Sequence, residues 1–213
     1  KIIVLIVLLG VISGFIPKLT GILHFWVVYS FHSSALLLDG GDQIATIFTF
    51  LLIPITILDR RINHWKSVKT QSTISKLIGH LSFLMISIQT SFIYLNTAVE
   101  KIYQLDDWKN GTALYYIFNN SFFGVNDTLL NYLGFIINSK MVFFLTWGVI
   151  LSHLILSYSL FLKRNDRKKV FWIGVSLHLS IALFMGLFSF SFAIIGVLIL
   201  YCLPFNYKND EKK

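Results

Sequence analysis

The sequence is poor in charge and in cysteine. Charged residues make up 13% of its 213 residues, where a soluble domain has about 25%, and 55% are hydrophobic. It has one cysteine, Cys202, which excludes an internal disulfide and gives no support to a cysteine-based metal or redox site. The few charges are bunched between long apolar runs. This pattern excludes an ordinary soluble domain and indicates an integral membrane protein.

The sequence also lacks the short motifs of several enzyme classes. It contains no P-loop, no GxGxxG, no Gx[ST]xG elbow and no CxxC, so nucleotide use and serine-type hydrolysis have no support. No HxxxH or HxxEH spacing occurs, and no carboxylate lies within a predicted span except Glu100 at the end of one, so no metal site is predicted. The net charge of +8 does not indicate a nucleic-acid partner, because the basic residues fall in short loops rather than in one patch.

Six apolar segments reach or approach the length of about 20 residues that a helix needs to cross a bilayer. The clearest is Met141–Leu162, with 22 residues. The first has only 15, which we interpret as the end of a helix whose start precedes the sequence. Pro54 is expected to kink the second. The predicted spans are 2–16, 44–58, 75–101, 141–162, 170–188 and 192–203.

The expected fold is an all-α, polytopic membrane helical bundle of about six transmembrane helices. Residues 1–205 would form one transmembrane domain and residues 206–213 a polar cytoplasmic tail. The segment 18–43 mixes apolar, aromatic and histidine residues, which suits an interfacial or partly re-entrant piece. The sequence does not decide whether 20–38 spans the bilayer, re-enters it or lies flat.

The distribution of basic residues predicts the orientation. The loops 59–76 and 163–169 carry five Lys and Arg each, while 17–43 carries one and 99–140 carries three against four acids. Cytoplasmic loops of membrane proteins are enriched in Lys and Arg. A multi-pass protein with both chain ends cytoplasmic is therefore predicted, with interfacial segments at 17–43 and 99–140 on the outer face.

The stretch Asn96–Phe118 holds the main candidates for chemistry. It combines Lys101, the acidic pair Asp106 and Asp107, and Trp108, between two predicted spans. A polar, aromatic segment in that position must lie at the water–lipid interface or line a cavity. Tyr115 and Tyr116 add aromatic surface for a substrate.

A polar stripe is predicted on the helix that precedes this stretch. Ser87, Tyr94 and Lys101 follow His80 at intervals of seven residues, close to two helical turns, so the four side chains share one face. Histidine and lysine in membrane helices usually face the bundle interior or water. Alternatively, Ser87 and Tyr94 only hydrogen-bond neighbouring helices, and Lys101 only reaches the interface.

The histidines allow two interpretations. His178 lies about eight residues into its predicted span and is expected near the middle of the membrane. It would share a polar cavity with His80, and with His153 as a further candidate, and carry protons there. The plainer interpretation is that each histidine is a satisfied core residue. Lys101, beside Glu100, is either part of a buried ion pair or a base.

The chain resembles a known family. NTAVEKIYQLDDWKNGTALYYIF is similar to the Lys–Trp–Gly–aromatic stretch of the HTTM domain, the membrane domain of vitamin K-dependent gamma-carboxylases. HFWVVYSFHSSALLLDGGDQI, LDRRINHW and LHLSIALFMGLFSFSFAIIGVLILY are closer to its SdpB-like bacterial branch. The resemblance implies a bacterial cell-membrane protein that works with an SdpA-like partner. Together they would mature or export a secreted antimicrobial peptide toxin from its precursor.

The resemblance also implies site residues. In the carboxylase branch a lysine of this stretch is the catalytic base toward vitamin K hydroquinone, and Lys101 is the matching position. Alternatives from other classes are a quinone-dependent carboxylase or oxidoreductase and a non-enzymatic, toxin-binding immunity protein. The sequence leaves open whether the protein is an enzyme, which cofactor it uses and its oligomeric state. The expected catalytic residues are Lys101, His178 and His80, and the expected substrate-binding residues are Asp106, Asp107, Trp108, Tyr94, Tyr115 and Tyr116.

Overall fold

The protein is built from α-helices. The computed structural model describes residues 2–35, 40–66, 72–121 and 124–203, and its only extended pairing in these ranges is one isolated bridge between Phe15 and Asn63. The predicted all-α class is therefore confirmed, while the predicted tail at 206–213 lies outside the described residues. The chain divides into two compact units, Lys1–Ile86 and Ser87–Lys213, with the boundary inside a long helix.

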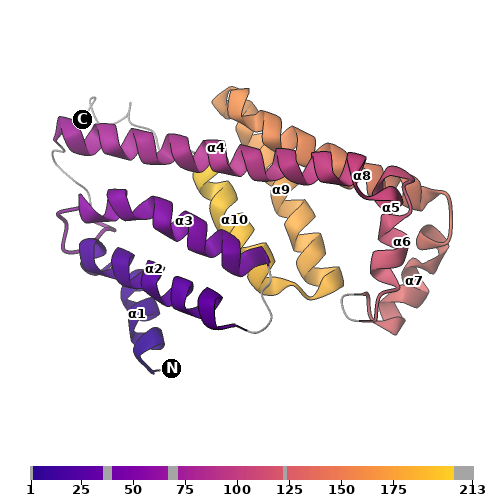
Figure 1. Ribbon diagram of the computed structural model, residues 1–213, viewed down its shortest axis with the longest axis horizontal. Coiled ribbons are helices and arrows are strands. Elements are labelled where there is room, and N and C mark those ends of the chain that lie inside the picture. The colour runs from indigo at the N-terminus through magenta and orange to yellow at the C-terminus, as the bar shows by residue number, and fades with distance from the viewer. Residues whose placement is uncertain (1, 36–39, 67–71, 122–123, 204–213) are drawn as a thin grey trace. The chain divides into compact units, whose positions relative to one another are not determined.

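The helices follow one another along the chain as labelled in Figure 1. The first unit holds α1 (Ile2–Ser13), α2 (Pro17–Ser34), α3 (Gly40–Ile57) and the beginning of α4 (Thr73–Tyr103). The second unit holds the rest of α4, then α5 (Asp106–Lys109), α6 (Ala113–Phe118), α7 (Asp127–Ile137), α8 (Met141–Tyr158), the 3-10 helix η1 (Ser159–Phe161), α9 (Arg164–Met185) and α10 (Phe188–Cys202).

Four helices of the described chain are long and apolar enough to cross a membrane: α3, α4, α8 continued by η1, and α9. They confirm four of the six predicted spans as helices of the required kind. The remaining two, α1 and α10, have 12 and 15 residues, fewer than the roughly 20 of a straight span. The finer count of six membrane crossings therefore stays a prediction.

In the first unit, α2 and α3 pack against each other (Figure 1). Near the start of α2, Gly21 faces Thr56 near the end of α3, and a Cβ at Gly21 would collide with that side chain. One turn further on, the rings of Phe25 and Phe50 lie 5.4 Å apart. The two helices therefore run antiparallel. The segment expected to be interfacial or re-entrant contains a regular helix of 18 residues.

The turn after α1 is hydrogen-bonded to the loop after α3. The Ile16 N–H donates to the Ile62 carbonyl over 2.7 Å, and the His64 N–H donates to the Gly14 carbonyl over 2.9 Å. These two bonds form the isolated bridge. They hold two segments together that lie almost fifty residues apart in the sequence.

Side chains of the same loop satisfy the last carbonyls of α1, which have no partner within the helix. Asn63 Nδ2 donates to the Ser13 carbonyl over 2.9 Å. Trp65 Nε1 donates to the Ile12 carbonyl over 3.3 Å. The turn and the loop thus form one hydrogen-bonded structure, which we call the clamp, consisting of residues 13–18 and 59–66.

The clamp corrects the predicted topology. The six-span assignment put the segment that begins at residue 17 on the outer face and the loop 59–76 on the cytoplasmic side. Segments that hydrogen-bond to each other lie on the same side of a membrane, so these two cannot be separated by it. The physical reason is that α2 runs back along α3, and Lys18, His24 and His32 interrupt the apolar pattern that would have revealed it.

In the second unit, α9 and α10 form a hairpin that packs on α8 (Figure 1). Gly174 of α9 allows the closest approach, because a Cβ there would lie 2.9 Å from Leu156 of α8 and 2.7 Å from Leu198 of α10. Both leucines are fully buried. The three helices therefore meet at a position where any side chain larger than hydrogen would force the core apart.

The end of α8 is tied to two other helices. The Tyr201 hydroxyl of α10 donates to the carbonyls of Leu156 and Ser157 over 3.0 and 3.2 Å. The Ser91 hydroxyl of α4 donates to the Ser157 carbonyl over 2.8 Å. Tyr201 is fully buried and Ser91 is 9% exposed, so both bonds lie inside the unit. They fix α4 and α10 against the last turn of α8.

Replacing Tyr201 with phenylalanine should lower the free energy of unfolding by about 1 to 2 kcal/mol, because buried carbonyls lose a donor while the ring still fills its space. For a chain of this size the melting temperature would fall by about 2 to 8 °C. Thermal unfolding of the purified protein in detergent measures this. Tyr158, which is 61% exposed, provides the control, and its change to phenylalanine should have no effect. Equal shifts in both variants would contradict the assigned role of the Tyr201 hydroxyl.

Candidate functional site

Two polar side chains meet in the core of the second unit. The Tyr94 hydroxyl of α4 lies 3.0 Å from Nε2 of His178 in α9, and each residue is only 2% exposed. The polar stripe predicted for α4 thus faces the bundle interior at this level. Both residues stand on helices long enough to cross a membrane, so the pair lies well away from water.

Only one of the two ring nitrogens of His178 forms a hydrogen bond among the described residues. Its Nδ1 atom is buried and has no hydrogen-bond partner among the described residues. If Tyr94 donates to Nε2, then Nδ1 carries a proton without an acceptor; if Nε2 donates to Tyr94, then Nδ1 is a lone pair without a donor. A buried polar atom left unpaired costs about 1 to 3 kcal/mol. The arrangement therefore offers one free proton donor or acceptor in the core, which favours a chemical role over a purely structural one.

A second histidine lies beside this pair. The ring of His153 in α8 is 5.7 Å from the ring of Tyr94, and His153 is 7% exposed. Its Nδ1 donates to the Val149 carbonyl over 2.7 Å, so in the neutral ring Nε2 is an acceptor. His153 is near enough to His178 and to Lys101 for their charges to interact. The cluster thus contains two imidazoles, a phenol and an ammonium from three helices.

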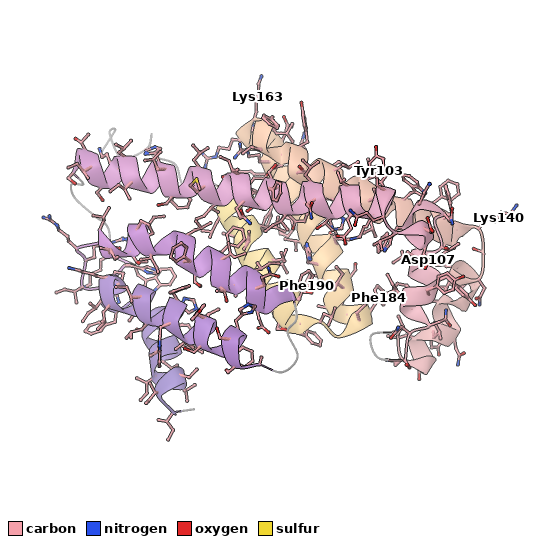
Figure 2. All side chains as sticks on the ribbon, viewed as in Figure 1. Tyr103, Asp107, Lys140, Lys163, Phe184 and Phe190 are labelled. Carbon is pink, nitrogen blue, oxygen red and sulfur yellow. The ribbon has the colours of Figure 1, made fainter. Side chains whose placement is uncertain are left out.

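Lys101 connects the cluster to the segment that follows α4. Its Nζ lies 4.7 Å from the centre of the Trp108 ring, a cation–π contact. Trp108 belongs to the short helix α5, which also carries Asp107, labelled in Figure 2. The ammonium therefore lies over the Trp108 ring, and its charge acts on His153.

The segment 106–118 is fixed against α8. Gly111 has a φ of 76°, a left-handed conformation that side chains disfavour, and a Cβ there would collide with the Phe143 ring. The Leu114 N–H donates to the Thr146 hydroxyl over 3.4 Å. These contacts fix the turn between α5 and α6 against α8. The turn follows Trp108 directly, so it also limits the movement of the Trp108 ring over Lys101.

The other predicted residues lie outside the cluster. Asp106 and Asp107 are exposed, as are Tyr115 and Tyr116, whose rings meet edge to face with centres 5.3 Å apart. All four are exposed side chains of the segment that follows Lys101 in the sequence. His80 belongs to the first unit, is exposed, and donates from Nδ1 to the carbonyl four residues earlier over 2.7 Å.

One polar residue of the core escaped the sequence analysis. Ser191 of α10 is fully buried, and its hydroxyl has no hydrogen-bond partner within the described part of the chain. Ser152 and Ser176, by contrast, donate to the carbonyl four residues earlier over 2.7 and 2.8 Å. The only signal for Ser191 in the sequence is that it is one of two serines at the start of an apolar helix. Among the residues described, no group of three or more His, Cys, Asp or Glu could hold a metal ion.

Comparisons with known proteins show to which family the chain belongs. No family model and no solved structure matches it, so the likeness to the HTTM domain stays an expectation. The uncharacterized protein YitO of Bacillus subtilis (strain 168) is 36% identical over 200 residues, which cover 93% of this chain and 64% of YitO. Sporulation-delaying protein SdpB of the same organism is 34% identical over 196 residues, 91% of this chain and 60% of SdpB. The chain spans a little under two thirds of the length of these curated relatives. At this identity over nearly all of its length, the chain belongs to the SdpB-like family.

Proposed function

We propose that this protein is a membrane factor in a peptide-toxin pathway, and that with an SdpA-like partner it matures or exports a secreted antimicrobial peptide. The observation that carries the proposal is the identity with sporulation-delaying protein SdpB over 91% of the chain. The buried cluster supports it, because a membrane helix that carries unpaired polar groups is costly unless those groups have a task.

In this proposal Lys101 is the residue that meets the precursor. Its ammonium is close to the interface through Trp108 and close to the core through His153. A lysine acts as a base only in its neutral, deprotonated form. Neutral Lys101 would take a proton from the precursor, and the buried His153 and the Tyr94–His178 pair would line the bundle side of the site.

The exposed surface beside Lys101 would hold the precursor. Asp106 and Asp107 attract a cationic segment, and Tyr115 and Tyr116 give a peptide apolar contact area that is already fixed by packing. A cationic or hydrophobic peptide is the class that fits this combination. The surface lies on the segment that the distribution of basic residues assigns to the outer face, where a secreted precursor would arrive.

A co-expression experiment tests the function. The precursor and the SdpA-like partner are expressed with or without this protein, and the secreted peptide is measured by mass spectrometry. A mass-shifted or shortened peptide that depends on this protein is the expected result for maturation, and a larger secreted amount of unchanged mass is the result for export. If mass and amount are both unchanged, the proposal is wrong. Protection of a sensitive cell by this protein alone would then indicate an immunity role.

A further inference from the structure

The clamp of the first unit presents a surface that neither the cluster nor the proposed function uses. Its loop is organised by Arg61, whose Nη2 and Nε lie 2.6 and 2.8 Å from the Asp59 carboxylate. Nη1 of Arg61 donates to the carbonyls of His64 and Lys66 over 2.6 and 2.9 Å. Four of the five guanidinium N–H groups are thus bonded within the loop, and they fix the loop backbone.

The ion pair between Arg61 and Asp59 also keeps the negative charge of the Asp59 carboxylate away from the surface of the clamp. Burial acts to raise the pKa of Asp59, but the hydrogen bonds and the charge of Arg61 outweigh it and hold that pKa below its usual range. The carboxylate therefore stays ionised and paired near neutral pH. Of the described clamp residues, Asp59 is the one acid, so nothing in the clamp opposes a second negative charge.

Cations and large apolar side chains point outward from this fixed backbone. Lys18, Arg60 and Lys66 are exposed. Ile62 is 70% and Trp65 72% exposed, although the Trp65 indole N–H is bonded to the end of α1. The surface is thus both basic and apolar, and its conformation is set before any partner arrives.

We propose that this surface binds the headgroups of anionic phospholipids in the leaflet that borders the clamp. Tryptophan and isoleucine insert at the level where headgroups meet acyl chains, and lysine and arginine beside them contact phosphate. The clamp sits at the ends of α1 and α3, and α1 exposes apolar side chains such as Ile2 and Ile6 along its length. The apolar part of the surface continues onto a helix suited to lipid. An acidic protein partner would not require that continuity.

The corrected topology also supports lipid binding at this surface. The distribution of basic residues alone places Lys18 on the outer face, away from the basic loop. Hydrogen bonds between Ile16 and Ile62 bring the start of α2 to the loop instead, so Lys18 adds its charge to Arg60 and Lys66. All the exposed cations of the clamp therefore border one leaflet.

Lipid binding by the purified protein tests the proposal. The intact protein in detergent is titrated with phosphatidylglycerol or phosphatidylcholine, and bound lipid is counted by native mass spectrometry. Wild type should prefer phosphatidylglycerol, and the combined variant Lys18→Gln, Arg60→Gln, Lys66→Gln should lose about fivefold in affinity for each charge removed. These side chains are exposed, so the variant should melt at the wild-type temperature.

The matched control removes three exposed cations of the second unit, in the variant Lys109→Gln, Lys140→Gln, Lys163→Gln. It changes the net charge equally and should keep the preference for phosphatidylglycerol. Equal losses in both variants would show a non-specific charge effect and overturn the proposal. So would a wild-type protein that binds the two lipids equally, which would leave an acidic protein as the partner to seek.

Discussion

Replacing Lys101 with methionine should lower the yield of processed peptide about 100-fold or more while the protein still inserts and accumulates. Methionine keeps the length and apolar stem of the side chain but cannot carry or release a proton. A positioned acid or base contributes about 10²- to 10⁴-fold to the rate of proton transfer. The measurement is the co-expression experiment, with the peptide quantified by mass spectrometry and the membrane protein by immunoblot.

Lys109 provides the control for that variant. It lies in the same interfacial segment, one residue after Trp108, but its side chain is exposed and belongs to the surface. Its change to methionine should leave processing within about twofold of wild type, because surface charges contribute little. Normal processing by the Lys101 variant would remove Lys101 from the chemistry, whatever the Lys109 variant does.

The stripe on α4 shows what could be predicted of the site. A spacing of seven residues fixes which side chains share a helix face, so Tyr94 and Lys101 were found from sequence alone. Which residues face them depends on how α8 and α9 pack against α4, and no local pattern encodes that. The contact between Tyr94 and His178 joins residues 84 positions apart. The sequence also predicted His178 and His153 for a shared cavity, but the fold was needed to show that both lie against Tyr94 and that His80 is exposed instead.

The sequence leaves the path of α2 open for a different reason. A hydropathy pattern measures how well a segment suits lipid on all sides, but a helix that packs on a neighbour can carry polar residues on that face. α2 carries two histidines and several serines and still lies along α3. Its position then follows from tertiary contacts such as the one between Phe25 and Phe50.

The packing of the second unit rests on a glycine that the sequence does not distinguish from others. Gly174, Gly148 and Gly196 all lie inside apolar helices. A Cβ at Gly174 would press on two leucines, while one at Gly148 or Gly196 would meet nothing within 4 Å. The difference lies in which face of the helix each glycine occupies relative to its neighbours, so the close approach had to be seen in the structure.

Replacing Gly174 with valine should therefore cost about 3 kcal/mol of unfolding free energy and lower the melting temperature by about 6 to 12 °C. Leu156 and Leu198 are fully buried and already lie 2.9 and 2.7 Å from a Cβ at this position, so the larger valine should move α9 away from α8 and α10. That movement would also separate His178 from Tyr94, which stands on a helix held to α8 by Ser91, so processing should fall together with stability. Gly196→Val, with open space around it, should leave both properties unchanged. If the two valine variants melt alike in detergent, the close approach at Gly174 does not govern the packing of the bundle.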